Sequence, residues 1–168
     1  FAADMRGDAK GRWIDDALMS MVQSNRIGSE ILFAGGATAC TDVTGFGLLG
    51  HLVEMAKPSE VDVELELQAL PLLDGALDCV RNGIFSSLQP QNVRLRRAIR
   101  GDANGCRESE ILPLIFDPQT AGGLLATVPE AEAANCVDTL RKAGYPTAAI
   151  VGSILPQSNH LEPITLVG

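Results

Sequence analysis

The chain has 168 residues, 46% of them hydrophobic, which is the size and composition of one globular domain spanning residues 1–168. Aromatic residues make up only 4%, so the core must be built from aliphatic side chains. The net charge of −8 argues against a nucleic-acid partner, because binding to phosphate backbones requires clustered Lys and Arg.

The first third of the chain predicts two helices on either side of a brief strand. Apolar residues recur at spacings of three and four along residues 13–33, as on one face of a helix, and two glycines end that helix. Residues 37–50 begin as a short strand, which two further glycines break before residues 48–55 predict a second helix. Pro58 ends this helix, because proline cannot continue its hydrogen bonding.

The middle of the chain predicts a strand, a helix and a loop. Residues 61–67 alternate with period two, which is typical of a half-buried strand with one acidic face. The side chains expected to face inward are Val61, Val63, Leu65 and Leu67. Residues 70–82 predict a third helix. Residues 84–105 are rich in Gly, Asn, Ser and Pro, and they predict a loop around a short element near 93–99.

The last third returns to regular structure. An apolar run at 111–116 leads into a polar turn, and residues 123–128 predict a buried strand. Residues 129–143 predict a helix with Pro at its start and Gly just past its end, and residues 148–155 predict a last strand. Helices and strands are mixed without strict alternation. We therefore expect an α+β fold, with a mixed, mostly antiparallel sheet covered by the helices at 14–33 and 129–143.

The cysteines and the hydropathy indicate a reducing compartment. The four cysteines lie far apart and form no C-x-x-C pair; they are Cys40, Cys79, Cys106 and Cys136. Free thiols are therefore favoured over two disulfides or a zinc site. No apolar stretch reaches the roughly 18 residues of a membrane span, and no signal peptide is visible, so we expect a cytoplasmic protein. The first residue is Phe1, which suggests a fragment or a processed product.

Two other groups of residues are interpreted as ordinary. A basic run predicts a solvated face, with a phosphate-side patch as the alternative; its members are Arg94, Arg96, Arg97 and Arg100. His51 and Glu54 form an H-x-x-E pair on the second predicted helix, but the second His of a metalloprotease helix is missing. We interpret this pair as ordinary helix residues.

The most informative stretch is TDVTGFG at residues 41–47, which brings a carboxylate, a hydroxyl and two glycines to the start of a helix. Asp42 offers the hard oxygen that Mg²⁺ prefers, since Mg²⁺ usually takes one or two carboxylates together with substrate phosphates. Gly45 and Gly47 let the backbone approach closely, and N–H groups at a helix start can face an anion. The simpler alternative is that Asp42 and Thr44 cap the helix.

A second stretch, DPQTAGGLL at residues 117–125, is a polar turn that leads into an apolar strand. It predicts a loop facing a ligand or a partner domain. The alternative is a tight turn in which Asp117 caps its own backbone. The residue types alone leave both interpretations open.

The chain resembles the C-terminal domain of selenophosphate synthetases, also called selenide, water dikinases. The resemblance is carried by residues 37–55 (ATACTDVTGFGLLGHLVEM) and 116–125 (FDPQTAGGLL). Residues 11–15 and 21–25 are also similar to the helix that opens that domain, whereas residues 100–110 match least. The TDVTGFG-like motif is shared more loosely across the aminoimidazole ribonucleotide synthetase superfamily. The resemblance implies that superfamily's C-terminal fold, which is ferredoxin-like in part.

The resemblance implies that this chain is one part of an enzyme that makes selenophosphate, AMP and phosphate from selenide, ATP and water. ATP would lie between this domain and an N-terminal ATP-binding domain, within a homodimer. The N-terminal domain would supply the reactive Cys or selenocysteine, a Lys, a Gly-rich segment and most metal-binding aspartates. None of these motifs is in this chain, so no catalytic residue is expected in it and the chain alone should be inactive.

The resemblance also carries over to individual residues. Asp42 matches the family's Asp that helps to coordinate Mg²⁺ on the ATP phosphates. Thr44 and Gly45 lie beside it and are implied as phosphate neighbours. Ala121 departs from the Ser that family members often have, which puts a hydroxyl role there in doubt.

Two alternatives remain at this stage. The same domain could come from another superfamily member, such as aminoimidazole ribonucleotide synthetase or the hydrogenase-maturation dehydratase. A non-catalytic dimerisation or interaction module is the other alternative. An upstream Cys or selenocysteine followed shortly by Lys, near a Gly-rich segment, would favour the selenium enzyme.

Overall fold

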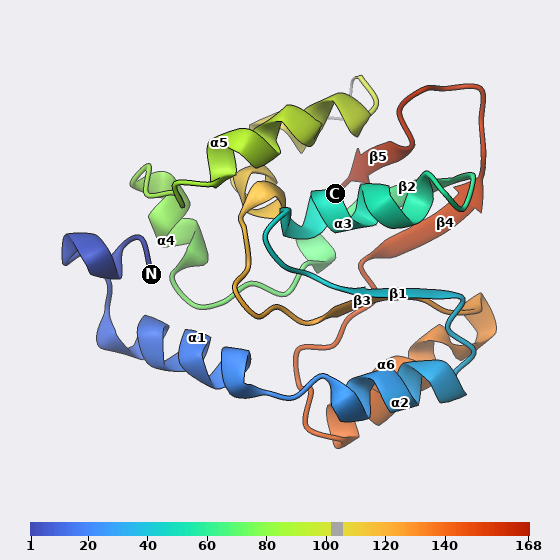
Figure 1. The fold of residues 1–168 in the computed structure, drawn as a ribbon, viewed down its shortest axis with the longest axis horizontal. Helices are drawn as coiled ribbons and strands as arrows, with labels where there is room; N and C mark the ends of the chain where they lie inside the picture. The colour runs from blue at the N-terminus through green and yellow to red at the C-terminus, as the bar shows by residue number, and fades with distance from the viewer. Residues whose placement is uncertain (102–105) are drawn as a thin grey trace.

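The computed structural model of the chain describes residues 1–101 and 106–168 (Figure 1). Its helices and strands mix along the chain. The α-helices are α1 (Gly11–Val22), α2 (Arg26–Ala34), α3 (Gly47–Ala56), α4 (Ala76–Arg81), α5 (Gln89–Asn92) and α6 (Glu130–Lys142). The strands are β1 (Ala39–Asp42), β2 (Val61–Glu66), β3 (Leu124–Thr127), β4 (Gly152–Pro156) and β5 (Ile164–Val167). Short 3-10 helices connect them at Asp4–Arg6, Leu67–Ala69, Val93–Ala98, Cys106–Glu108 and Leu112–Phe116.

The described strands form two small sheets. β1 pairs with β3 in antiparallel register, with Asp42 opposite Leu124. In the second sheet β2 is central, antiparallel to β4 and parallel to β5. The expected α+β class with a mixed, mostly antiparallel arrangement is therefore confirmed. The strands are divided between two sheets, because β1 and β3 pair only with each other.

The main core lies between α3 and the β2–β5 pair. α3 buries residues three and four positions apart, which places them on one face of the helix. The buried apolar side chains of β2 and β5 lie two positions apart along each strand, and for β2 the sequence pattern predicts this spacing. The fully or nearly buried members of this cluster include Leu49, Leu52, Ala56, Val63, Leu65, Leu67, Ile164 and Leu166. Val61 is only half-buried, at the start of its strand.

A second layer covers the β1–β3 pair. Figure 1 shows α2 and α6 side by side below these two strands, and α2 also packs on β3. Tyr145 follows α6 and ties the layer together, since its hydroxyl accepts the Gly28 N–H at 2.9 Å and donates to the Ser24 carbonyl at 2.7 Å. The predicted helix at 129–143 is confirmed as α6. α1 does not share in this cover, because it buries none of its residues.

The segment 13–33 is two helices, so the prediction of one continuous helix was wrong. The chain is extended at Gln23, and Gln23 Nε2 donates to the Gly144 carbonyl at 2.6 Å. Asn25 Nδ2 donates to the Gly122 carbonyl at 3.1 Å. These two long-range hydrogen bonds stabilise the extended segment between α1 and α2. The apolar spacing continues across it, so periodicity alone does not reveal it.

Three other predicted segments need correction. Residues 70–75 are not helical, because Pro71 biases Leu70 toward the extended conformation, and only Ala76–Arg81 form α4. The last predicted strand, 148–155, is shifted to Gly152–Pro156, and a further strand at Ile164–Val167 was missed. The predicted loop at 84–105 contains α5 and a 3-10 helix at Val93–Ala98, which confirms the short element near 93–99. Residues 102–105 of that loop lie outside the described residues.

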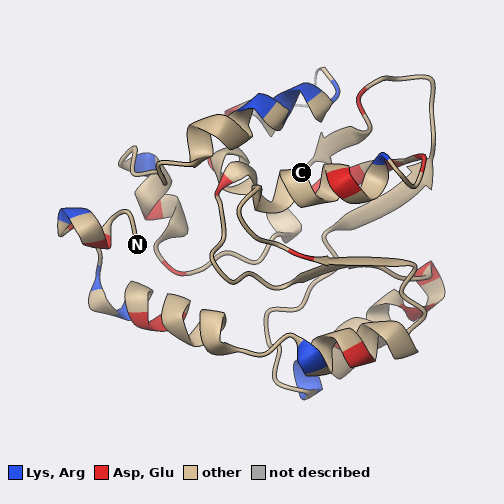
Figure 2. Cartoon of the chain, in the orientation of Figure 1, with Lys and Arg blue, Asp and Glu red and all other residues tan. Residues whose placement is uncertain are grey.

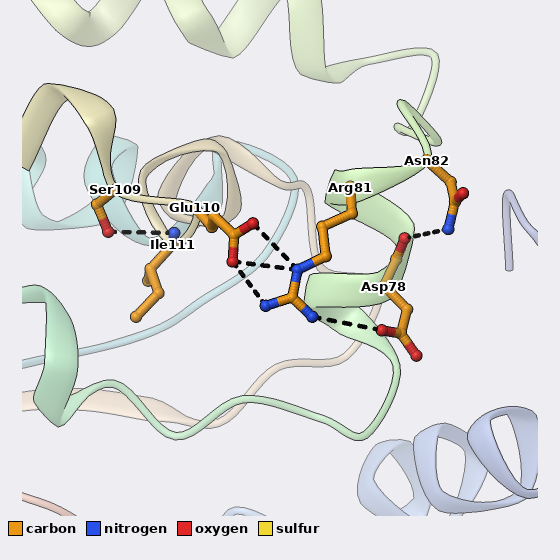
Figure 3. Close-up of polar contacts among 6 residues, drawn as sticks. All are labelled: Asp78, Arg81, Asn82, Ser109, Glu110 and Ile111. Atoms are coloured by element: carbon orange, nitrogen blue, oxygen red, sulfur yellow. Dashed lines mark hydrogen bonds and ion pairs between the residues drawn. The ribbon is translucent and has the colours of Figure 1, made fainter.

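An exposed ion pair joins α4 to the segment before Leu112 (Figure 3). Arg81 Nε donates to both carboxylate oxygens of Glu110 at 3.0 and 3.1 Å, and Nη2 donates to Oε2 at 2.7 Å. The hydrogen bonds from Arg81 lower the pKa of Glu110. The pair is exposed to solvent, so it orients the two segments and contributes little to stability.

The acidic face of β2 is not wholly solvated, contrary to the sequence pattern. Asp62 is only 3% exposed, and it accepts the Ser158 N–H at 2.9 Å and pairs with Arg100. Arg100 Nε also donates to the Glu162 carbonyl at 2.8 Å. Arg100 therefore does not share the solvent-exposed face of the basic run. The other members of the run are exposed on the segment after α5 (Figure 2). Asp62 and Arg100 both form hydrogen bonds with the loop between β4 and β5, through Ser158 and Glu162, and they link β2 to that loop.

This pair predicts acid sensitivity. Hydrogen bonding to Ser158, and then to Arg100, lowers the pKa of Asp62. The folded pKa lies below the unfolded value of about 3.9, so the carboxylate stabilises the fold above that value. The contribution is lost as pH falls from about pH 5 through the lowered pKa. We expect the free energy of unfolding to fall more steeply with acid in the wild type than in Asp62→Asn.

Urea titrations of both proteins from about pH 7 to about pH 3 measure this difference. Glu110 is present in both proteins, so its own lowered pKa cancels in the comparison. Parallel curves for the two proteins would contradict the assignment.

Candidate functional site

The two stretches that carry the candidate residues meet at the end of the β1–β3 pair. The Val43 N–H donates to the Gly123 carbonyl at 2.9 Å, directly after Asp42 ends β1. The Gln119 N–H donates to the Thr44 carbonyl at 3.0 Å. The loop of residues 43–46, called here the site loop, therefore lies against the turn at 117–123.

Glycine is required where these segments touch. A Cβ on Gly122 would lie 2.1 Å from the Val43 carbonyl oxygen. Gly47 has a φ of 70°, and a Cβ there would lie 2.9 Å from the Ile115 carbonyl oxygen. These two glycines serve contacts within the protein. Gly45 differs, because nothing lies within 4 Å of the position of its missing Cβ.

His51 forms hydrogen bonds with the site loop. Its side chain comes from α3, is 6% exposed, and its Nε2 accepts the Thr44 N–H at 3.0 Å. Nε2 also lies 3.1 Å from Thr44 Oγ1, and Nδ1 lies 3.3 Å from Glu54 Oε2. The interpretation of His51 as an ordinary helix residue did not anticipate this contact with the site loop. The available signal was a polar residue within the otherwise apolar run at 48–53.

Asn92 holds the same loop from another side. It is 7% exposed, and its Nδ2 donates to the Gly45 carbonyl at 2.9 Å and to the Phe116 carbonyl at 3.0 Å. One buried amide thus joins the site loop to the segment that precedes the turn at 117–123. Asn92 fell within a predicted loop, and nothing in the local sequence marks it.

Asp42 is the exposed, unengaged carboxylate of the site. It ends β1, and within the part of the chain that the structure describes its carboxylate has no hydrogen bond or ion pair. The N-cap of α3 is Phe46, and no side chain caps this helix. The capping interpretation of Asp42 and Thr44 is therefore wrong.

Two backbone donors lie beside Asp42. Among residues 1–101 and 106–168, the N–H groups of Gly45 and Phe46 have no hydrogen-bond partner. They immediately precede α3, whose start carries the partial positive charge of the helix. The Thr44 N–H is occupied by His51, so the donors open to a ligand are those of the next two residues.

Neighbouring groups supply no nucleophile. Burial, and then the negative charge of Asp42, raise the pKa of the Cys40 thiol, which favours the unreactive protonated form. Burial also raises the pKa of Asp117, although the hydrogen bond from Gln119 Nε2 to its Oδ2, 3.1 Å long, opposes this. Asp117 is thus engaged with a side chain of its own turn. Ala121 is exposed on that turn.

The donor set fits a Mg²⁺ ion that is only partly held by this chain. Mg²⁺ commonly uses one or two carboxylates, with phosphates and water as its other ligands. Asp42 offers one such carboxylate, and no group of three or more His, Cys, Asp or Glu in the described residues forms a metal cage. The remaining ligands would have to come from a phosphate, water or another domain. No described helix has the length and hydropathy needed to cross a membrane.

Comparisons with known proteins show which family the chain is similar to. The family model "AIR synthase related protein, C-terminal domain" matches residues 3–160. The chain is 34% identical over 145 residues to a selenide, water dikinase of Clostridioides difficile (strain 630), covering 85% of this chain and 41% of that protein. It is 36% identical over 151 residues to a selenide, water dikinase of Rhizobium meliloti (strain 1021), covering 90% and 43%.

The chain therefore spans about two fifths of the length of these relatives. Among solved structures, hydrogenase maturation protein HypE in complex with ATP is similar, with a TM-score of 0.53 at 23% identity. That match covers 82% of this chain and 33% of HypE, and at this identity it shows the fold alone.

Proposed function

The chain belongs to the family of AIR synthase related proteins, as the C-terminal domain, and on this premise we propose that it is the C-terminal domain of a selenide, water dikinase. Residues 1–168 would form one domain of that enzyme and help to bind ATP with Mg²⁺. The names of the relatives support the reaction, and their greater length supports a further, ATP-binding domain as partner. The proposed homodimer and cytoplasmic location rest on the resemblance.

The observation that carries the proposal is the unengaged Asp42 carboxylate beside two open backbone N–H groups. In this proposal Asp42 holds Mg²⁺, and the Gly45 N–H faces a phosphate of ATP. Thr44 is a neighbour that shapes the loop, since both its N–H and its hydroxyl are engaged by His51. When bound, Mg²⁺ neutralises phosphate charge during phosphoryl transfer.

In this proposal the chain positions Mg²⁺ and the ATP phosphates, and another domain of the parent enzyme supplies the nucleophile. The raised pKa of Cys40 makes it a poor thiolate donor. Phosphoryl transfer depends on holding several charged groups together, and one carboxylate on one domain does not achieve this. The missing groups are assigned to the N-terminal domain of the parent enzyme.

We expect the 168-residue chain alone to form no AMP from ATP, whether or not selenide is present. The parent enzyme should form AMP in a selenide-dependent manner. Chromatographic measurement of AMP, with phosphorus NMR for selenophosphate, tests both statements. AMP formation by the chain alone would contradict the proposed division of labour, and a parent that forms neither AMP nor selenophosphate with selenide present would favour another synthetase of the superfamily.

A further inference from the structure

We propose that His51 is a positioning residue, which keeps the site loop in its ligand-binding shape by acting as a neutral hydrogen-bond acceptor. This inference rests on the proposed function, because it concerns the loop that carries the Mg²⁺–ATP contacts. His51 is not proposed to touch the ligand.

The hydrogen-bond geometry defines the form of the imidazole. The Thr44 N–H can only donate, and it lies 3.0 Å from His51 Nε2, so Nε2 must carry the lone pair. The ring proton then lies on Nδ1, which is 3.3 Å from Glu54 Oε2 but forms no hydrogen bond with it. Because the His51 residue is only 6% exposed, water does not readily replace the acceptor when it is lost.

The same ring also contacts the residue on the other side of Gly45. The centroids of Phe46 and His51 lie 5.7 Å apart, with the rings tilted by 46°. Asn92 fixes the Gly45 carbonyl at 2.9 Å. The two residues that flank Gly45 are thus both in contact with His51, and the carbonyl between them is tied to α5.

This arrangement determines which donors a ligand meets. The first N–H of the tight turn, that of Thr44, is used inside the protein, while those of Gly45 and Phe46 stay open. The loop is ordered when the chain folds, so binding does not have to order it again. Without the acceptor, the partly buried Thr44 N–H would lose its partner, and the loop would rearrange to regain one.

The test compares His51→Leu with His51→Gln in the parent enzyme. Leu removes the acceptor, whereas the Gln amide oxygen can reach the position of Nε2. We expect His51→Leu to raise the KM for ATP and the Mg²⁺ requirement about tenfold, with a smaller effect on kcat. His51→Gln should stay within about threefold of the wild type. Glu54→Gln, at the exposed neighbour, is the matched control and should also change little.

Hydrogen exchange gives a readout that does not depend on activity. The peptide covering residues 43–47 should exchange faster in His51→Leu than in the wild type, and His51→Gln should restore protection. If the Leu variant does not fold, His51→Asn takes its place, since its shorter amide does not reach Thr44.

Unchanged exchange and unchanged KM in a folded variant without the acceptor would overturn the positioning role. This failure is distinct from a failure of the proposed function. The inference alone fails if Asp42→Asn lowers activity while His51→Leu has no effect. The metal role within the proposed function fails if Asp42→Asn has no effect, and the exchange experiment then still decides whether His51 orders the loop.

Discussion

Asp42→Asn in the parent enzyme should preserve the fold and reduce turnover by about 100-fold or more. The expected size follows from metal sites, where the loss of a supporting group alone costs about 10–100-fold, and a direct ligand should matter at least as much. Asn keeps the shape of Asp but removes the charge that attracts Mg²⁺. The Asp42 carboxylate has no hydrogen bond or ion pair among the described residues, so stability should change by no more than about 0.5 kcal/mol.

The measurement is a Mg²⁺ titration of selenophosphate formation for the wild type and Asp42→Asn, with thermal melts alongside. Asp16→Asn is the matched control, because Asp16 is an exposed carboxylate on α1, outside the site loop. The control should behave as the wild type. Unchanged activity of Asp42→Asn at every Mg²⁺ concentration would remove the metal role.

Gly122→Ala should destabilise the protein by about 1–3 kcal/mol or more, the usual cost of inserting a group into a filled space. The new Cβ would lie 2.1 Å from the Val43 carbonyl oxygen, so the backbone on one side must move. That backbone leads directly into the site loop. We therefore also expect Gly122→Ala to need a higher Mg²⁺ concentration than the wild type for its half-maximal rate.

Gly123→Ala is the matched control, one residue further along the same turn. Nothing lies within 4 Å of its missing Cβ, and its φ is outside the left-handed region, so Ala fits without strain. The free energy of unfolding of Gly123→Ala should equal that of the wild type or be higher by up to about 1 kcal/mol. Urea unfolding of both variants measures the difference. Equal losses of stability in the two would show that the close approach of Gly122 to Val43 is not the cause of the destabilisation.

The sequence by itself determined the fold class and the principal segment of the site, because these depend on local signals. The alternation at 61–67 predicted β2, and the proline and glycine around 129–143 predicted α6. The TDVTGFG run placed Asp42 at the end of a strand and before a helix, as the structure has it. Its resemblance to one family, together with the FDPQTAGGLL run, supplied the function to be tested.

The tertiary structure alone decided which groups are engaged and which are open. Asp62 belongs to an acidic strand face in the sequence pattern, yet Arg100 and Ser158 from other segments allow it to be buried. Asn92 and His51 reach the site loop from different helices, and the resulting hydrogen bonds occupy Thr44 and the Gly45 carbonyl. Such contacts join residues that are distant or unremarkable in the sequence. Periodicity and capping signals report only neighbouring residues, whereas the satisfaction of buried polar groups depends on the whole packed chain.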